Sequence, residues 1–414
     1  MRASFFLLSL IAAAVRAAPA TAPVDLIVHD ARIHTVDISR PQVAAMAVRD
    51  GRIVFIGSDR EALSLRGAKT RLLDLDGQTV IPGMIDAHAH LLGLGQGLQT
   101  IDLRATTSYD AVIAKVIERR EATPAGRWIV GRGWDQNDWA DTRFPEHAAL
   151  STQTAQHPVL LERVDGHAVL VNAAALKAAG ITRDTPDPEG GRIERDARGE
   201  PTGVLVDNAI DQVTKVMPAP TIDELRDAVT RAITELQRWG LTGVHDAGVP
   251  RDVIGVYEAL AREGRYGLRN YVMVAGTDAD IDWALARGAQ NGLHDGRLWL
   301  RSIKLSADGA LGSRGAWLLE PYADAPGHSG LATLPAGRVR AVATKALKAG
   351  FQVNTHAIGD RANRVVLDEL ADAFDAVPVA DHRFRIEHAQ ILHPDEIARF
   401  AELGVIPSMQ SSHQ

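Results

Sequence analysis

Two histidines separated by a single residue, His88 and His90, follow an apolar run in residues 79–92, which read TVIPGMIDAHAHLL. Residues two positions apart in an extended strand face the same side, so both imidazoles are expected on one face. Neutral imidazole is the commonest side-chain ligand for metal ions in proteins. The pair therefore predicts part of a metal site, and the alternative is two packing histidines at the end of a strand.

The same arrangement recurs later in the chain, where polar side chains directly follow apolar β-runs. They are His245 with Asp246, Lys304, His356 and His388. In a barrel of parallel strands the carboxyl ends of the strands meet at one face, where active residues lie. We therefore expect these side chains to come together at that face. For His245 and Asp246 the alternative is a packed or supporting pair.

The elements that must position these residues are strands of a parallel sheet. From Thr221 onward, apolar β-runs alternate with helical patterns of about 10 to 15 residues, which predicts βαβ units. Counting the run that ends at His88, seven strands fit before Gln414, whereas a (β/α)8 barrel has eight. The predicted fold class is α/β, a TIM barrel over residues 81–414 with seven strands present and the eighth missing.

A small β-rich segment precedes this predicted barrel. Residues 19–80 contain short β-runs separated by the dipeptides Asp50-Gly51 and Asp76-Gly77, which are typical of hairpin turns. We expect part of a β-sandwich here.

An insertion of mixed character, residues 100–220, separates the first barrel strand from the rest. Such a segment is expected to lie over the barrel mouth, where loops commonly carry substrate contacts. Its substrate-binding candidates are Trp134, Asp135, Trp139 and His167. The alternative is that the tryptophans fill the core of the insertion itself.

Composition restricts the class of partner and the compartment. The chain has 414 residues and a formal net charge of -7 without a basic run, which argues against nucleic acid as the main partner. Residues 1–18 have the layout of a secretory signal peptide, with cleavage after Ala17 or Ala18, so we expect a periplasmic or secreted protein without a further membrane segment. Because there is no cysteine, a metal must use His, carboxylate or modified Lys. The expected partner is a small-molecule amide, and a homo-oligomer is left open.

Four motifs together resemble a known family. The His88–His90 pair, Lys304 in RSIKLSADGALGSRGA, His356 in NTHAIGDRA and His388 in RIEHAQ are similar to the amidohydrolase superfamily. The resemblance is to its amidohydrolase 3 branch, whose members are amide and imide hydrolases similar to N-substituted formamide deformylase. It implies a metal-dependent-hydrolase barrel, a flanking β-sandwich and a divalent metal centre, usually zinc, with one or two ions.

The resemblance also implies roles for individual residues. His88 and His90 would hold one metal, His356 and His388 the second, and Lys304 would bridge them in a carboxylated form. Lys304, His356 and His388 would then be the catalytic residues, and the reaction would be hydrolysis of a non-peptide carbon–nitrogen bond by metal-activated hydroxide. For Lys304 the alternative is an unmodified lysine paired with a carboxylate.

One departure from the family pattern leaves other functions open. The proton-transferring Asp that the family carries on strand eight has no counterpart, since the sequence ends before that strand. Asp360 is expected as a helix N-cap, and Asp308, a further substrate-binding candidate, also fits a turn or a supporting role. The alternatives are a truncated, inactive remnant, or an esterase, lactonase or phosphoesterase on the same metal barrel.

Overall fold

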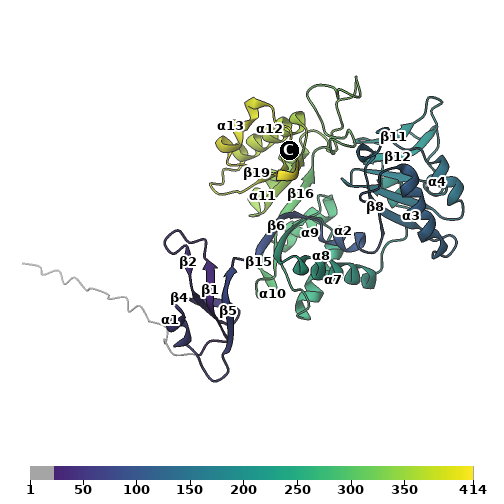
Figure 1. Cartoon of the computed structure of the whole chain (residues 1–414). Helices are drawn as coiled ribbons and strands as arrows, with labels where there is room; N and C mark the ends of the chain where they lie inside the picture. The colour runs from purple at the N-terminus through teal and green to yellow at the C-terminus, as the bar shows by residue number, and fades with distance from the viewer. Residues whose placement is uncertain (1–22, 414) are drawn as a thin grey trace, which may run out of the picture. The chain divides into compact units, whose positions relative to one another are not determined.

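A computed structural model describes residues 23–413 of the chain, in two compact units that divide between Gly83 and Met84 (Figure 1). The predicted signal peptide, residues 1–18, lies outside the described residues. Among those that are described, no helix has the length and apolar character needed to cross a membrane.

The first unit contains one five-stranded sheet. Its strands are β1 (Leu26–His34), β2 (Gln42–Val43), β3 (Ala45–Arg49), β4 (Arg52–Gly57) and β5 (Arg71–Val80), and one helix, α1 (Asp59–Leu63), accompanies them. The strand order is β2-β1-β3-β4, and β5 runs parallel to β1. The described part of this unit is thus a single sheet, and the expected β-sandwich stays a prediction.

The two Asp-Gly dipeptides behave differently. Asp50-Gly51 joins β3 to β4 with positive φ at both residues, as the predicted two-residue hairpin requires. Asp76-Gly77 also has positive φ, yet it lies inside β5, where the pairing with β1 shifts register. The predicted hairpin at this second position is wrong, because the dipeptide forms a β-bulge within a continuous strand.

Seven parallel strands form a nearly closed barrel in the second unit. In chain order they are β6 (Met84–Ala89), β13 (Leu241–Val249), β14 (Arg269–Val274), β16 (Leu298–Ser306), β17 (Gln352–Ala357), β18 (Arg385–His388) and β19 (Ile406–Ser408). Each pairs with the next in parallel, so the predicted seven-stranded barrel is confirmed. Among the described strands, β6 and β19 stand at the two ends of the order, and the short β15 (Gln290–Gly292) adds to β16.

Helices alternate with these strands and share one apolar core with them. They are α2 (Leu91–Gly97), α7 (Ile222–Arg238), α8 (Arg251–Arg262), α9 (Asp278–Arg287), α10 (Leu293–Gly296), α11 (Arg338–Lys348), α12 (Asp360–Ala376) and α13 (Pro394–Leu403). Thr221 and Glu224 form the capping box of α7. The expected cap of α12 is off by one residue, since Gly359 is the N-cap and Asp360 is the first helical residue.

The insertion between β6 and β13 folds around its own sheet, drawn in blue in Figure 1. The strand order is β11 (Gly191–Arg195), β12 (Pro201–Asp207), β10 (Ala168–Val171), β9 (Val159–Arg163), β8 (Ile129–Trp134) and β7 (Ile101–Asp102). Its helices are α3 (Tyr109–Glu121), the 3-10 turn η1 (Gln136–Asp138), α4 (Ala148–Gln153), α5 (Ala173–Ala179) and α6 (Asp211–Thr214). Two apolar clusters pack within it, so the insertion has an interior separate from the barrel core.

Candidate metal centre

Four of the predicted histidines meet at the carboxyl ends of the barrel strands. The ring centroids of His88 and His90 are 5.4 Å apart, those of His88 and His388 are 4.7 Å apart, and those of His356 and His388 are 4.6 Å apart. The chain turns sharply after β18, where His388 and Ala389 both have positive φ. Positive φ is strained for residues other than Gly, and such strain is concentrated at functional sites.

Hydrogen bonds fix the orientation of three of these rings. Nδ1 of His88 lies 2.6 Å from Oε2 of Glu387, and Nδ1 of His90 lies 3.0 Å from the carbonyl oxygen of Ala247. Nδ1 of His388 lies 2.9 Å from the side-chain oxygen of Gln410. Because these oxygens accept hydrogen bonds, each Nδ1 carries the hydrogen and each Nε2 keeps a lone pair.

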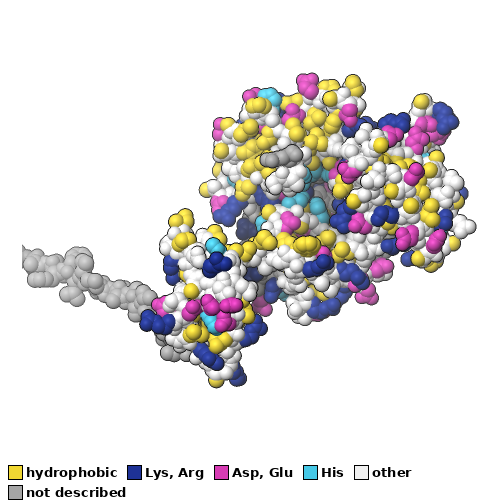
Figure 2. Space-filling model, in the orientation of Figure 1, with side chains coloured by type: hydrophobic (Ala, Val, Ile, Leu, Met, Phe, Trp, Pro, Cys, Tyr) yellow, Lys and Arg dark blue, Asp and Glu magenta, His cyan; other side chains and the backbone are white. Residues whose placement is uncertain are grey.

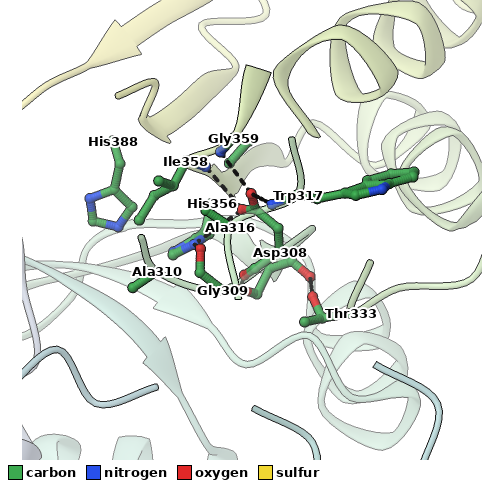
Figure 3. A network of polar contacts seen from close by, with 12 residues as sticks. Asp308, Gly309, Ala310, Ala316, Trp317, Thr333, His356, Ile358, Gly359 and His388 are labelled. Atoms are coloured by element: carbon green, nitrogen blue, oxygen red, sulfur yellow. Dashed lines mark hydrogen bonds and ion pairs between the residues drawn. The ribbon is translucent and has the colours of Figure 1, made fainter. Parts of the chain in front are cut away.

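Asp308 holds the fourth histidine in place from beneath. Its carboxylate accepts backbone N–H groups of Ile358 and Gly359, at 2.9 and 2.8 Å, and of Trp317, at 2.9 Å (Figure 3). Nε2 of His356 lies 3.3 Å from the same carboxylate, which leaves Nδ1 free of it. Burial raises the pKa of Asp308 to about 7. This fully buried side chain braces two loops, and the substrate contact predicted for it stays a prediction.

The electrostatics of the cluster favour neutral rings. Burial lowers the pKa of His90 to about 3, with the nearby Lys304 adding to the effect. Burial and the neighbouring His356 lower the pKa of His388 to about 2. Burial also lowers the pKa of Lys304 to about 8, so a larger fraction of its amine is neutral near pH 7 to 8 than for an ordinary lysine. Neutral imidazole and neutral amine are the forms with lone pairs.

The neutral imidazoles of this cluster are suitable ligands for a cation, although their nitrogen atoms do not all point to one position. Nε2 of His88 is buried and meets no hydrogen-bond partner in the part of the chain that the structure describes. Within residues 23–413, no three His, Asp or Glu side chains are close enough as they stand to hold an ion.

A buried ion network lies behind His88. Glu387, whose side chain is fully buried, lies between His88 and Arg385. Although burial opposes it, the hydrogen bond from His88 and the charge of Arg385 hold the pKa of Glu387 at about 2. Arg385 also donates to Nδ1 of His245 at 2.8 Å and to the carbonyl oxygen of Ala87 at 2.8 Å. The network thus connects β6, β13 and β18.

A cavity of about 1020 Å³ opens between the barrel and the insertion, with His90 in one wall and His167 in the other. Figure 2 shows histidine side chains gathered in a hollow between these two parts. Nδ1 of His167 lies 2.7 Å from Oδ1 of Asp207, and its ring centroid is 5.0 Å from that of His356. Although burial favours the neutral ring, Asp207 raises the pKa of His167. The insertion therefore brings a histidine to the barrel histidines.

Three other predicted pocket residues lie elsewhere. Trp134 is 1 % exposed, donates its indole N–H to the carbonyl oxygen of Leu161 at 2.7 Å and packs beside Trp139. The tryptophans thus fill the core of the insertion, which was the alternative to a pocket role. Asp135 caps η1 and pairs with Arg163.

Residues 71–414 match the family model Amidohydro_3, described as the amidohydrolase family. The chain belongs to the amidohydrolase family. The resemblance inferred from the four motifs is thereby confirmed.

Relatives and solved structures agree with this amidohydrolase assignment. Protein LONG AFTER FAR-RED 3 of Arabidopsis thaliana is 35% identical over 407 residues, which are 95% of this chain and 69% of that protein. N-substituted formamide deformylase of Arthrobacter pascens is 28% identical over 395 residues, 92% of this chain and 72% of that enzyme. An uncharacterized metal-dependent hydrolase from Pyrococcus horikoshii has a TM-score of 0.71 at 26% identity, and the match covers 93% of this chain and 74% of that one.

Several residues around the site of this amidohydrolase were not found from the sequence. Glu387 and Arg385 occupy alternate positions of the strand RIEH, and charged residues at alternate positions of a short buried strand could have indicated a polar barrel interior. Asp207 follows an apolar run in β12, as the predicted site residues follow theirs. Asp246 accepts hydrogen bonds from the backbone N–H of Leu91 and from the Tyr257 hydroxyl. These contacts agree with the alternative that it holds neighbouring segments in place.

Proposed function

We propose that this chain is a metal-dependent hydrolase that cleaves a carbon–nitrogen bond other than a peptide bond, as in an amide, formamide or imide. The observation that carries the proposal is His88, whose Nδ1 is held by Glu387 while its buried Nε2 meets no partner among the described residues. A buried polar atom without a partner costs free energy, and a cation would satisfy it. Membership of the amidohydrolase family and the likeness to a formamide deformylase support the choice of bond.

Five residues would hold the metal in this proposal. Nε2 of His88, His90 and His388, Nδ1 of His356 and a carboxylated Lys304 are the proposed ligands. One or two divalent ions would bind, and zinc suits a site rich in imidazole. When bound, such an ion lowers the pKa of water toward neutrality and polarises a carbonyl oxygen.

Residues of the chain itself would position the substrate. His167 faces the cavity, is 23% exposed at its side chain and has an Nε2 without a hydrogen bond within residues 23–413. Asp207 fixes the orientation of this ring, so its Nε2 can contact the substrate opposite the barrel histidines. Glu387 and Asp308 hold His88 and His356 from behind.

Metal content and reaction type can be measured on the same preparation. The protein is purified without chelator, bound zinc, manganese and iron are measured per chain, and amide, formamide, imide, ester, lactone and phosphoester substrates are assayed in parallel. We expect about one or two metal ions per chain and the fastest turnover on a carbon–nitrogen bond, lost with chelator and restored by metal. A folded protein without metal would contradict the proposal, and faster ester or phosphoester hydrolysis would favour the alternative reactions.

The proposed setting is the periplasm or the exterior, and the proposed partner is a small-molecule amide rather than nucleic acid. This part rests on the signal-peptide pattern of residues 1–18 and on the net charge of -7. Fractionation of cells that express the tagged chain should place a shortened form outside the cytoplasm. Retention of the full-length form in the cytoplasm would contradict export, and light scattering would give the oligomeric state.

A further inference from the structure

Arg132 brings a guanidinium group to the cavity wall, close to the candidate metal centre. It lies on β8 of the insertion, its side chain is 36% exposed, and it lines the same cavity as His90. Its Nη1 and the Cβ of His90 each lie 3.6 Å from the position that a Cβ on Gly93 would occupy. A Cβ at Gly93 would contact both groups, so Gly93 keeps this part of the cavity wall free of a side chain.

The donors of Arg132 are not satisfied by the protein. A guanidinium has five N–H donors, and in the described part of the chain its only recorded polar contact is Oε1 of Glu162, 3.5 Å from Nη1. That separation is too long for a good hydrogen bond. Arg163 on the next strand is the contrast, because it pairs with Asp135 and Asp165 and is only 2% exposed at its side chain.

The charges around the cavity leave this cation available. Burial raises the pKa of Glu162, and the charge of Arg132 opposes this shift. Asp165, also in the cavity wall, is already committed to Arg163 and to the backbone N–H of His167. Lys215 adds a second cation at the rim, where it is exposed. The cavity wall therefore carries two cations, Arg132 and Lys215, and the carboxylate paired with Arg132 is 3.5 Å away rather than at hydrogen-bond distance.

We propose that Arg132 binds a carboxylate of the substrate, so that the preferred substrate is an acidic amide whose carboxylate lies a few atoms from the bond that is cleaved. This inference rests on the proposed hydrolase function. The fork of a guanidinium matches the two oxygens of a carboxylate, which gives both affinity and orientation. Because Arg132 and His90 line the same cavity, a carboxylate held by Arg132 would direct the rest of the substrate toward His90.

The test compares two substrates that differ only in charge, N-formyl-leucine and its neutral amide, N-formyl-leucinamide. Metal-loaded wild-type protein should favour N-formyl-leucine in kcat/KM by roughly 10- to 100-fold, since hydrogen bonds to a charged group are among the stronger ones. R132Q should lose this preference, mainly through a higher KM for N-formyl-leucine, with N-formyl-leucinamide unchanged. R132K, which keeps the charge but loses the fork, should fall between them.

Two controls keep the result interpretable. R143Q removes the same charge from an exposed insertion arginine that does not line the cavity, and it should behave as wild type. Metal content and the thermal transition of R132Q should match those of wild type, because the side chain makes no hydrogen bond within residues 23–413. Equal losses on both substrates, or a wild-type preference for the neutral amide, would overturn the proposal.

Calorimetric titration separates this inference from the proposed function. N-formyl-leucine should bind wild-type protein roughly 10- to 100-fold more tightly than R132Q, whether or not it is cleaved. Tight, Arg132-dependent binding without hydrolysis would contradict the hydrolase function and leave the carboxylate site standing. Hydrolysis of both formamides with equal efficiency would support the function and refute the carboxylate site.

Discussion

Two histidine–carboxylate pairs of similar length face each other across the site, one in the barrel and one in the insertion. Nδ1 of His88 is 2.6 Å from Glu387, and Nδ1 of His167 is 2.7 Å from Asp207. The difference lies at the other nitrogen. Nε2 of His88 is sealed from solvent without a partner among the described residues, whereas His167 keeps 23% of its side chain exposed toward the cavity.

The same hydrogen bond therefore serves two different roles. In both pairs the carboxylate fixes the ring and directs Nε2 away from itself. A sealed Nε2 next to other neutral imidazoles suits a metal ligand, while an accessible Nε2 on the facing wall suits contact with a substrate. Exposure, rather than the pairing itself, distinguishes the two proposed roles.

Removal of the barrel imidazole should have the largest effect. We expect H88A to lose metal and to hydrolyse no substrate above background, because no other side chain can replace the missing ligand. H34A removes an exposed histidine of β1 in the first unit and is the matched control. Metal content per chain by mass spectrometry decides the outcome, and wild-type content in H88A would remove His88 from the site.

Removal of the insertion imidazole should instead spare the metal. H167Q should lower kcat roughly 10²-fold, as expected for loss of one polar contact to the reacting group, with metal content unchanged. D207N should have a smaller effect, because the amide oxygen of Asn can still accept the hydrogen bond from Nδ1. If H167Q lost metal as H88A does, the distinction between the two pairs would fail.

Weakening of the barrel pair should reduce metal affinity rather than abolish it. E387Q keeps an acceptor for Nδ1 of His88 but removes the charge, and loss of such a supporting partner typically costs 10- to 100-fold in metal affinity. Competition with a zinc-buffering chelator measures this change. Thermal unfolding is needed beside it, since Arg385 would lose its buried counter-charge in this variant. An unchanged zinc affinity in a folded variant would contradict the role given to Glu387.

Substitution of Asp246, a buried carboxylate without a histidine partner, should give the smallest effect, which is confined to the pH dependence of stability. Burial raises the pKa of Asp246 to about 6 from 3.8. Between these values the folded state binds a proton that the unfolded state releases, so the free energy of unfolding falls as pH rises. D246N cannot titrate, so its stability relative to wild type should rise by about 2 kcal/mol between pH 4 and pH 7. Urea unfolding at each pH checks this, and parallel curves would refute it.

The barrel and its histidines could be predicted because both follow from local patterns. An apolar run followed by His88, His356 or His388 marks a strand end, and parallel strands bring their carboxyl ends together. The supporting carboxylates could not be assigned in this way. Glu387 and His88 are 299 positions apart in the sequence. Only the arrangement of the strands in the barrel shows which histidine hydrogen-bonds to this carboxylate.

The errors have equally local causes. Trp134 is the last residue of β8, a position typical of pocket residues, but alternation alone does not say which side of the insertion sheet faces its core. Asp76-Gly77 has the composition of a hairpin turn, yet the neighbouring strand β1 accepts it as a bulge. In both cases tertiary packing decided between two structures that the local sequence allows equally well.

The pairing of β6 with β13 across the insertion has a consequence for the order of folding. Thr242 on β13 contacts the carbonyl oxygen of Met84 on β6, 158 positions earlier in the chain. Closing a loop of that length costs chain entropy, and contacts distant in sequence slow folding. The insertion, with its own interior, can collapse first and shorten the span that remains to be closed. We therefore expect β6 to join the barrel late, and with it His88 and His90, so that metal added during refolding should be captured only in the slowest phase.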